Sequence, residues 1–185
     1  AEFMLTELQK SDDLKSRRHL FTRVFFYGAG CSSHERNQLV KDVLKQFFDK
    51  AEVIEVDHDL KAAAYATYTG QPGITCILGT GSNSCLFDGK EIYEEVPSLG
   101  HMLGDEGSGC VLGKRLLALY LYHRLPEATN AIMRDTYGLT KEKIFDMVYK
   151  QPSVNRTMAS FAKVLSETPD KEFVIQLVKD NFREF

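Results

Sequence analysis

The sequence predicts a mixed α/β protein in which parallel strands alternate with helices. An apolar segment at residues 23–30 ends in glycines, and a helix-type spacing of apolar residues follows over 32–50. A second apolar segment, 51–56, comes directly after that helix. Strand, helix and strand joined by short connections are typical of a parallel sheet, because a crossover helix is needed to return the chain to the same edge.

The first third of the chain carries local signals for each of its elements. Leucines within 5–14 predict an initial amphipathic helix that ends in a run of basic residues. Ser32 or Ser33 can cap the helix that follows the first strand. An alanine-rich helix over 60–68 is closed by Gly70, a residue type that commonly ends helices.

The pattern breaks at Pro72, and a new set of strands begins there. We therefore expect residues 1–71 to form part of one lobe and residues 72–185 to form part of a second lobe. Residues 74–78 are apolar on both faces, as the central strand of a sheet should be.

The remainder of the second lobe is predicted to be a hairpin followed by helices. The hairpin spans 84–96, and its Asp-Gly pair at 88–89 suits a two-residue turn. A long helix is expected over 110–125. Only helices are expected after it, with breaks near Pro152 and Pro169.

Composition excludes several functional classes. With 23 Lys and Arg against 26 Asp and Glu, the net charge is -3. This balance provides no positive electrostatic potential that would attract nucleic acid. No apolar run is long enough to span a membrane, and no signal peptide is evident, so a cytoplasmic protein is expected. The four cysteines form no CxxC pair and are interpreted as reduced thiols in the core.

A polar, glycine-framed bend follows the strand at 74–78. Gly79 and Gly81 permit positive φ and close approach by another group. Successive amides in such a bend can form a concavity that binds phosphate oxygens, and Thr80 lies at its centre. The alternative is an ordinary hairpin turn. We favour the ligand loop because a second polar glycine loop lies close behind in the sequence.

That second loop is GHMLGDEGSG, residues 100–109. Asp105 and Glu106 lie among four glycines directly before a helix. Either Asp105 or Ser108 could cap that helix, which explains the acids but not the glycines. Glycines around paired carboxylates also suit a site that small polyols approach closely, and both interpretations can hold together.

Asp59 is a third candidate, at the head of the alanine-rich helix. The residues alone favour a helix N-cap over a catalytic role. Asp59 nevertheless lies just beyond the carboxyl end of a predicted parallel strand, where α/β folds place their ligands. A carboxylate there could accept a proton from a hydroxyl that attacks a phosphoryl group.

Two stretches together, DHDLKAAAYATYTGQPGITCILGTGSNSCLFDGK and VPSLGHMLGDEGSGCVLGKRLL, resemble the N-acetylglucosamine kinase family. This family overlaps the BadF/BadG-type ATPases within the actin-, hexokinase- and Hsp70-like superfamily. The resemblance extends over residues 24–161. It implies a ribonuclease-H-like fold of two lobes that close on ATP and sugar, here as a partial unit with a helical C-terminal part.

The resemblance also implies a role for each candidate residue. Asp59 would be the general base for the 6-hydroxyl of an amino sugar, with Asp57 as the rival base. The bend at Gly79, Thr80 and Gly81 would bind the β- and γ-phosphates of ATP. Contacts to the sugar would come from Asn83, Leu99, Gly100, Asp105 and Glu106.

The expected ligands follow from the same resemblance. ATP would be the phosphate donor, with Mg²⁺ held largely by phosphates and water rather than by an all-protein cage. The second substrate would be an amino sugar, with N-acetylglucosamine as the best single candidate. Neither nucleic acid nor membrane is an expected partner, and the resemblance leaves room for a homodimer.

The sequence departs from the family at both ends and at one site residue. It contains neither the DGG-type first phosphate loop nor the glycine-rich adenosine segment. We therefore expect a fragment of a longer protein, with weak or no activity by itself. Leu99 stands where animal relatives carry tryptophan, which leaves the identity of the sugar open.

Two alternatives share the same fold. One is a non-catalytic module that senses sugars or muropeptides, or an ATPase that acts on another substrate. The other is an iron–sulfur ATPase, which needs a cysteine just before the glycine loop. Cys76 lies within the strand and Cys85 lies beyond the loop, so neither matches that position well.

Overall fold

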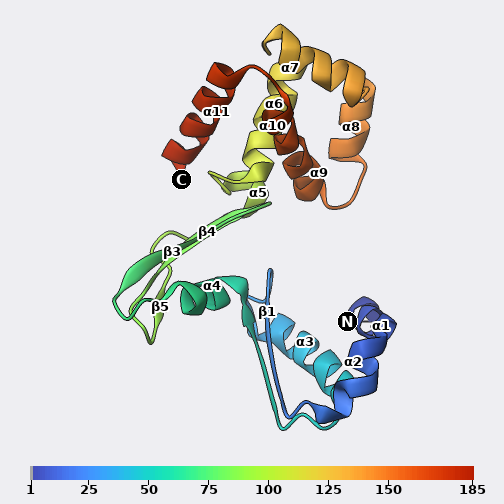
Figure 1. Ribbon diagram of the computed structural model, residues 1–185, viewed down its shortest axis with the longest axis vertical. Helices are drawn as coiled ribbons and strands as arrows, with labels where there is room; N and C mark the ends of the chain where they lie inside the picture. The colour runs from blue at the N-terminus through green and yellow to red at the C-terminus, as the bar shows by residue number, and fades with distance from the viewer. Residues whose placement is uncertain (1) are drawn as a thin grey trace. The chain divides into compact units, whose positions relative to one another are not determined.

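The chain forms two compact units in the computed structural model, which describes residues 2–185 (Figure 1). Unit 1 contains the described residues up to Thr75 together with Leu86–Tyr93, and unit 2 contains Cys76–Cys85 and Glu94–Phe185. The strands at 73–78 and 82–87 contribute residues to both units. The predicted lobe assignment, 1–71 and 72–185, stays a prediction.

Unit 1 is built around two parallel strands. Its elements are α1 (Glu2–Lys10), α2 (Asp12–Arg17), the 3-10 turn η1 (Arg18–Leu20), β1 (Arg23–Gly28), α3 (His34–Phe47), β2 (Val53–His58) and α4 (Asp59–Thr67). β1 pairs with β2 in parallel from Arg23–Val53 to Gly28–His58, so the predicted strand–helix–strand arrangement is confirmed. Ser33 caps α3, and its Oγ accepts the Arg36 amide at 3.3 Å.

The core of unit 1 lies between α3 and the parallel strands. Leu44, Phe47, Phe48 and Ile54 are buried there. Leucines of α1 and α2 pack against this cluster. The single initial helix predicted from the sequence is two helices, because Ser11 ends the first and caps the second by accepting the Leu14 amide.

A second sheet has the strand order β3 (Gly73–Leu78), β4 (Ser82–Phe87), β5 (Ile92–Tyr93). β4 and β5 pair in the antiparallel direction, which confirms the predicted hairpin. The predicted two-residue turn is wrong, because the connection contains the four residues 88–91. Asp88 holds this longer turn, since its Oδ1 accepts the Lys90 and Glu91 amides at 2.8 Å each.

The prediction that residues 74–78 form a buried central strand is also wrong. Within the described residues, β3 is an edge strand of its sheet. Ile74 is 77% exposed and Leu78 is 49% exposed. The apolar pattern was correct for a strand, but burial also depends on the neighbouring elements that cover its faces.

Unit 2 is helical beyond the sheet, as predicted. Its helical elements are α5 (Gly100–Leu103), α6 (Gly109–Leu121), α7 (Glu127–Ala131), the π-helical turn η2 (Ile132–Thr136), α8 (Lys141–Tyr149), α9 (Val154–Ser160), the 3-10 turn η3 (Phe161–Lys163), α10 (Val164–Glu167) and α11 (Lys171–Glu184). The long helix ends at Leu121 instead of residue 125, because His123 adopts a left-handed conformation with φ of 53°.

α6 is the central helix of unit 2 (Figure 1). Leu116 and Leu117 are buried on it and belong to the main apolar cluster, with Met133, Ile144 and residues of α9 and α10. The crossing with α9 is very close at Gly113. A Cβ built there would lie 1.7 Å from the Met158 carbonyl oxygen, so only glycine fits. This contact fixes α6, whose N-terminal end carries the loops described next.

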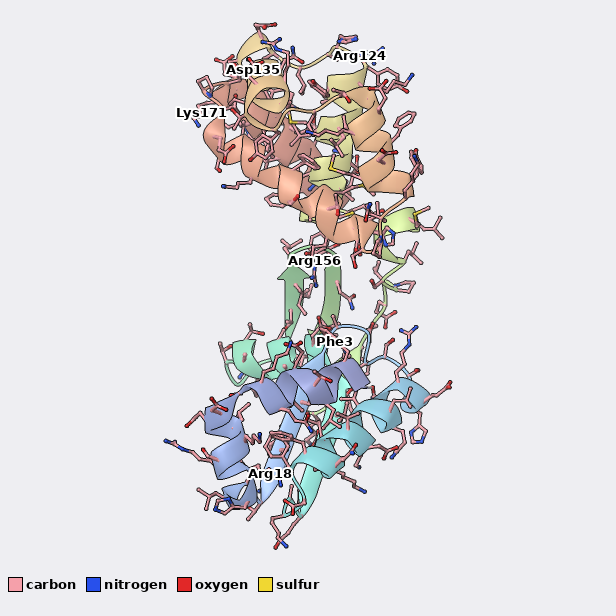
Figure 2. The ribbon with its side chains drawn as sticks, turned by 90° about the vertical axis from the view of Figure 1, so that its right-hand side faces the viewer. Phe3, Arg18, Arg124, Asp135, Arg156 and Lys171 are labelled. Atoms are coloured by element: carbon pink, nitrogen blue, oxygen red, sulfur yellow. The ribbon has the colours of Figure 1, made fainter. Side chains whose placement is uncertain are left out.

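The outer surface of the helices in unit 2 mixes charged side chains with exposed apolar ones such as Tyr149 and Ile175. Arg124, Asp135 and Lys171 are exposed and are labelled among the side chains in Figure 2. Among the described residues, no helix combines the length and the hydropathy that crossing a membrane requires.

Candidate functional site

The bend at Gly79–Gly81 is attached to the start of α6 by main-chain hydrogen bonds. The Gly109 amide donates to the Gly79 carbonyl at 2.8 Å, and the Cys110 amide donates to the Thr80 carbonyl at 3.1 Å. The Gly79 amide donates to the Gly81 carbonyl at 2.9 Å and closes the bend. Two consecutive carbonyls of the bend therefore point toward α6.

This orientation fixes where the amides of the bend point. All peptide bonds described here are trans, so each N–H is antiparallel to the carbonyl of the same peptide group. The Thr80 and Gly81 amides consequently point away from α6. Within residues 2–185 neither amide donates a hydrogen bond. Adjacent unpaired amides are the kind of donors that bind phosphate or carboxylate oxygens in main-chain anion sites.

Asp105 from the second glycine loop contacts this bend. A Cβ on Gly81 would lie 2.9 Å from Asp105 Oδ2, so the Asp105 carboxylate would have to shift if this residue were not glycine. The Ser82 amide donates to Asp105 Oδ1 at 3.3 Å. Asp105 has a φ of 62°, a conformation that is uncommon for residues other than glycine and that often marks a functional position.

The rest of the second loop joins the bend to α6. Ser82 Oγ donates to the Glu106 carbonyl at 2.6 Å. Ser108, which is fully buried, caps α6 by accepting the Val111 amide at 3.3 Å. Of the two predicted caps, Ser108 is confirmed, whereas Asp105 contacts the bend instead. Glu106 makes no ion pair in the described part of the chain.

The other predicted sugar-binding residues also belong to unit 2. Asn83 Oδ1 accepts the Ser84 amide at 2.8 Å, while its amide nitrogen has no partner among the described residues. Leu99 is 56% exposed. Gly100 has a φ of 71°, so glycine is favoured at this position.

Residues at the C-terminal end of the chain, on and after α11, contact the second loop. Asn181 on α11 is fully buried, and its Nδ2 donates to the Ser108 carbonyl at 3.4 Å. Asn181 Oδ1 has no hydrogen-bond partner within residues 2–185. A Cβ on Gly107 would lie 2.9 Å from Phe185 Cβ. Arg115 of α6 and Glu184 of α11 form an ion pair.

Asp59 lies in unit 1 as the first residue of α4. It is not the N-cap: His58 holds that position, and Asp59 Oδ1 accepts only the adjacent Leu60 amide at 3.0 Å. The predicted capping role is therefore wrong in detail. Asp59 forms no ion pair within residues 2–185, so its carboxylate has capacity to accept a further donor.

Unlike Asp59, Asp57 has a carboxylate that forms an ion pair with Lys61. Lys61 Nζ lies 2.5 Å from Asp57 Oδ2, and the His58 amide donates to Asp57 Oδ1 at 2.9 Å. Partial burial by itself would raise the pKa of Asp57, but these two donors hold the pKa below its usual value. The Asp57 carboxylate in turn raises the pKa of Lys61.

Cys31 is a buried thiol on which the charges of these acids act. Burial raises the pKa of Cys31, and the negative charges of Asp59 and Asp57 raise it further. A thiol in this environment stays protonated at neutral pH, so it is a core residue rather than a nucleophile.

The structure thus gathers Gly79, Thr80, Gly81 and Asp105 in unit 2, while Asp57 and Asp59 belong to unit 1. The sequence interpretation missed two contributors to these sites. Lys61 stands four residues after Asp57, and Asn181 is a polar residue on the apolar face of its helix. Each of these patterns could have indicated a contact.

Comparison with solved structures identifies the fold. The "Putative N-acetylglucosamine Kinase" from Porphyromonas gingivalis matches 97% of this chain with 38% sequence identity and a TM-score of 0.86. A protein of the same description from Chromobacterium violaceum matches 86% of the chain with 19% identity and a TM-score of 0.57. No protein-family model matches the sequence, and a search of curated proteins also gives no match.

The protein therefore has the actin/hexokinase-like α/β fold, as predicted. The resemblance to the N-acetylglucosamine kinase family is confirmed by the match to the Porphyromonas protein, while the Chromobacterium match supports the fold alone. The chain spans 64% of the Porphyromonas chain and 58% of the Chromobacterium chain.

Proposed function

We propose that this chain carries the phosphate- and sugar-binding parts of an ATP-dependent sugar kinase. The enzyme would transfer the γ-phosphate of ATP to the 6-hydroxyl of an amino sugar, with N-acetylglucosamine as the first candidate. The observation that carries the proposal is the pair of outward, unpaired amides at Thr80 and Gly81, with Asp105 in contact beside them. The Porphyromonas relative supports the same class of reaction by its description.

The bend fits the terminal phosphates of ATP without a basic side chain. Its amides supply fixed dipoles, and fixed donors stabilise phosphoryl charge without reorganising during the reaction. Gly81 leaves room for the Asp105 carboxylate, which a Cβ at this position would meet at 2.9 Å. Mg²⁺ bound to these phosphates would neutralise charge on the transferred group, and Asp105 is the carboxylate in contact with the bend that could orient its water ligands.

Asp59 is the proposed general base, and Asp57 is not. A base must accept a proton from the sugar hydroxyl as its oxygen attacks the γ-phosphorus and the bond to ADP breaks. The Asp57 carboxylate is already neutralised by Lys61 and accepts the His58 amide. Asp59 accepts only one neighbouring amide and could take that proton.

The sugar would be held by polar groups around the second loop. The carboxylates of Asp105 and Glu106 can accept hydrogen bonds from sugar hydroxyls. The unpaired amide nitrogen of Asn83 can donate a hydrogen bond to a hydroxyl oxygen. The main chain at Leu99 and Gly100 would complete the sugar site. Leu99 offers an exposed apolar surface rather than an aromatic ring, so stacking on the sugar would contribute little.

The test is sugar-dependent release of ADP. The chain, with any flanking residues that its gene encodes, would be incubated with MgATP and a panel of amino sugars and neutral hexoses. We expect ADP release to require an amino sugar, and the product to carry its phosphate at the 6-position by ³¹P NMR. ADP release that is independent of every sugar would instead indicate an ATPase, and sugar binding without turnover would indicate a sensing module.

A further inference from the structure

The segment directly before the second glycine loop is apolar and exposed. Leu99 is 56% exposed, and Met102 and Leu103 are 74% and 77% exposed. Leu99 precedes α5 with helical backbone angles, so the one-turn helix in effect begins at this residue. Residues three and four positions apart on a helical turn lie on the same side, so the three side chains form one apolar surface.

Gly104 brings this surface against the carboxylate of Glu106. A Cβ built on Gly104 would lie 3.0 Å from Leu99 Cβ and 3.4 Å from Glu106 Oε2. Gly104 itself is buried. The Leu99 side chain and the Glu106 carboxylate therefore meet at the same point of the loop, because residue 104 has no side chain to separate them.

An acceptor next to an apolar surface complements one particular group of an amino sugar. An N-acyl group has an N–H that can donate to a carboxylate, and a hydrocarbon end that gains free energy on leaving water. A free ammonium group could pair with Glu106, but it would lose hydration beside the apolar surface and would leave Leu99 without a contact.

We propose that Leu99 determines specificity for an N-acylated sugar. The acyl end would lie on Leu99, Met102 and Leu103, and the acyl N–H would donate to the Glu106 carboxylate. This inference rests on the proposed function and adds to it the residue that distinguishes an N-acylated sugar from a free amino sugar.

The apolar surface is larger than an acetyl group can cover. Met102 and Leu103 continue it beyond Leu99, and both are mostly exposed. Acyl chains of three or four carbons should therefore bind better than acetyl. Each additional methylene that leaves water should raise kcat/KM by a factor of about two to four.

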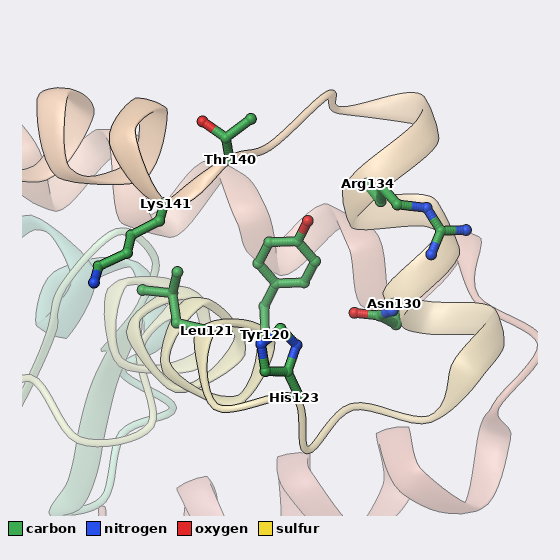
Figure 3. Close-up of a pocket in the computed structure, with 7 residues that line it drawn as sticks. All are labelled: Tyr120, Leu121, His123, Asn130, Arg134, Thr140 and Lys141. Atoms are coloured by element: carbon green, nitrogen blue, oxygen red, sulfur yellow. The ribbon is translucent and has the colours of Figure 1, made fainter.

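The hollow at the C-terminal end of α6 offers no comparable combination (Figure 3). There the Arg134 guanidinium donates to Asp135 at 2.8 and 3.0 Å, and the Tyr120 hydroxyl donates to the Leu139 carbonyl at 2.8 Å. Those groups already have partners, whereas Glu106 forms no ion pair in the described part of the chain. The second loop is therefore the better candidate for a ligand with both an N–H donor and an apolar end.

The test compares acyl groups on the same enzyme. The chain, with any flanking residues that its gene encodes, would be assayed with MgATP and glucosamine or its N-acetyl, N-propionyl and N-butyryl derivatives. N-acetylglucosamine should exceed glucosamine in kcat/KM about tenfold or more. Leu99→Ala should lower that ratio about three- to tenfold, since the acyl end loses its apolar contact. A ratio measured on one variant does not depend on how much of the variant is folded.

Ile175→Ala is the matched control. Ile175 is an apolar residue of α11 with a similar exposed fraction, 52%, and it lies outside the second loop, so its loss should leave every ratio unchanged. Three outcomes would overturn this inference alone: a kcat/KM for glucosamine that equals or exceeds that for N-acetylglucosamine, a fall from acetyl to propionyl, or the same ratios in the wild-type chain and Leu99→Ala. Absence of turnover with every sugar would instead overturn the proposed function, and this inference with it.

Discussion

The two parts of the candidate site are held in place by different kinds of interaction. In unit 2 the bend is fixed by hydrogen bonds from the Gly109 and Cys110 amides to its carbonyls, and by glycine contacts with Asp105. In unit 1 the charge interactions of Asp57 and Asp59 depend on a neighbouring side chain. Lys61 forms an ion pair with Asp57 and leaves Asp59 without one in the described residues.

The two parts should therefore respond differently to substitution and to pH. A site fixed by main-chain hydrogen bonds is sensitive to an added Cβ and insensitive to pH, because peptide groups do not titrate. A site set by ion pairs tolerates changes of shape better, but it depends on charge and pH. Substitutions at Asp59, Gly81, Lys61 and Asn181 can test that contrast.

Replacing the proposed base should have the largest effect. Asp59→Asn is expected to lower the rate of sugar phosphorylation by a factor of about 10² to 10⁴, because the amide cannot accept the proton. Asp57→Asn should retain most of the turnover, since Lys61 already neutralises that carboxylate. Steady-state ADP release measures both variants. Equal losses in the two variants would contradict the assignment of Asp59.

Adding one methyl group to the bend should have the next largest effect. Gly81→Ala is expected to cost about 1–3 kcal/mol of stability and to weaken ATP binding, because its Cβ would meet the Asp105 carboxylate at 2.9 Å. Gly79→Ala is the matched control, since a Cβ there meets nothing within 4 Å. Denaturant unfolding and calorimetry of ATP binding give the two readouts. The bend is not fixed as described if both variants unfold at the same denaturant concentration.

The ion pair in unit 1 should contribute less and should depend on pH. Asp57 and Lys61 are only 25% and 27% exposed, and Lys61→Met is expected to cost about 0.5–1 kcal/mol of stability at pH 7. The pKa of Asp57 is lowered on folding, so its contribution is present above the unfolded pKa of about 4 and is lost as the pH falls through the folded value. The pKa of Lys61 is raised, so its contribution is present below about pH 10.4 and is lost as the pH rises through the folded value.

Unfolding at pH 2, 7 and 12 measures this dependence. The difference between the wild-type chain and Lys61→Met should be largest at pH 7 and smaller at both extremes. Lys50→Met, which removes an exposed lysine of unit 1 that has no ion-pair partner in the described residues, should show no such maximum. A difference that does not change with pH would mean that Lys61 acts by packing alone.

The smallest effect is expected at Asn181. Asn181→Leu should change stability by less than about 1 kcal/mol, because it removes a long hydrogen bond together with an unsatisfied buried oxygen. The Ser108 carbonyl keeps a partner, since it also accepts the Leu112 amide at 3.1 Å. Thermal unfolding measures the change, with Leu177→Ala on the same helix as a destabilising reference. A large loss in Asn181→Leu would mean that α11, and not the main chain, fixes the second loop.

The elements that the sequence predicted well are those specified by neighbouring residues. Ser33 and Ser108 cap helices by bonding amides three residues ahead, so their patterns are visible in the sequence. The parallel pair β1 and β2 follows from a strand–helix–strand pattern of short connections. Gly79, Gly81 and Asp105 were predicted as site residues because glycines and polar or acidic residues are unusually dense in these two loops.

The features that were missed depend on partners far away in the sequence. From the sequence alone, Gly113 is expected to destabilise its helix. The structure shows that the Met158 main chain packs so closely there that a Cβ would not fit. β3 has the composition of a central strand, yet its exposure is set by which strands and helices lie beside it. Asp59 was predicted to cap α4, and only the path of the main chain shows that the helix begins one residue earlier.

The hydrogen bonds from α6 to the bend have an electrostatic consequence. Peptide groups joined head to tail polarise one another, and the carbonyls of Gly79 and Thr80 accept from the first two amides of α6. The dipole of a 13-residue helix is therefore continued through two further peptide groups, and its positive end emerges at the Thr80 and Gly81 amides. The helix dipole would in this way offset part of the negative charge of the neighbouring Asp105, in a bend that contains no lysine or arginine.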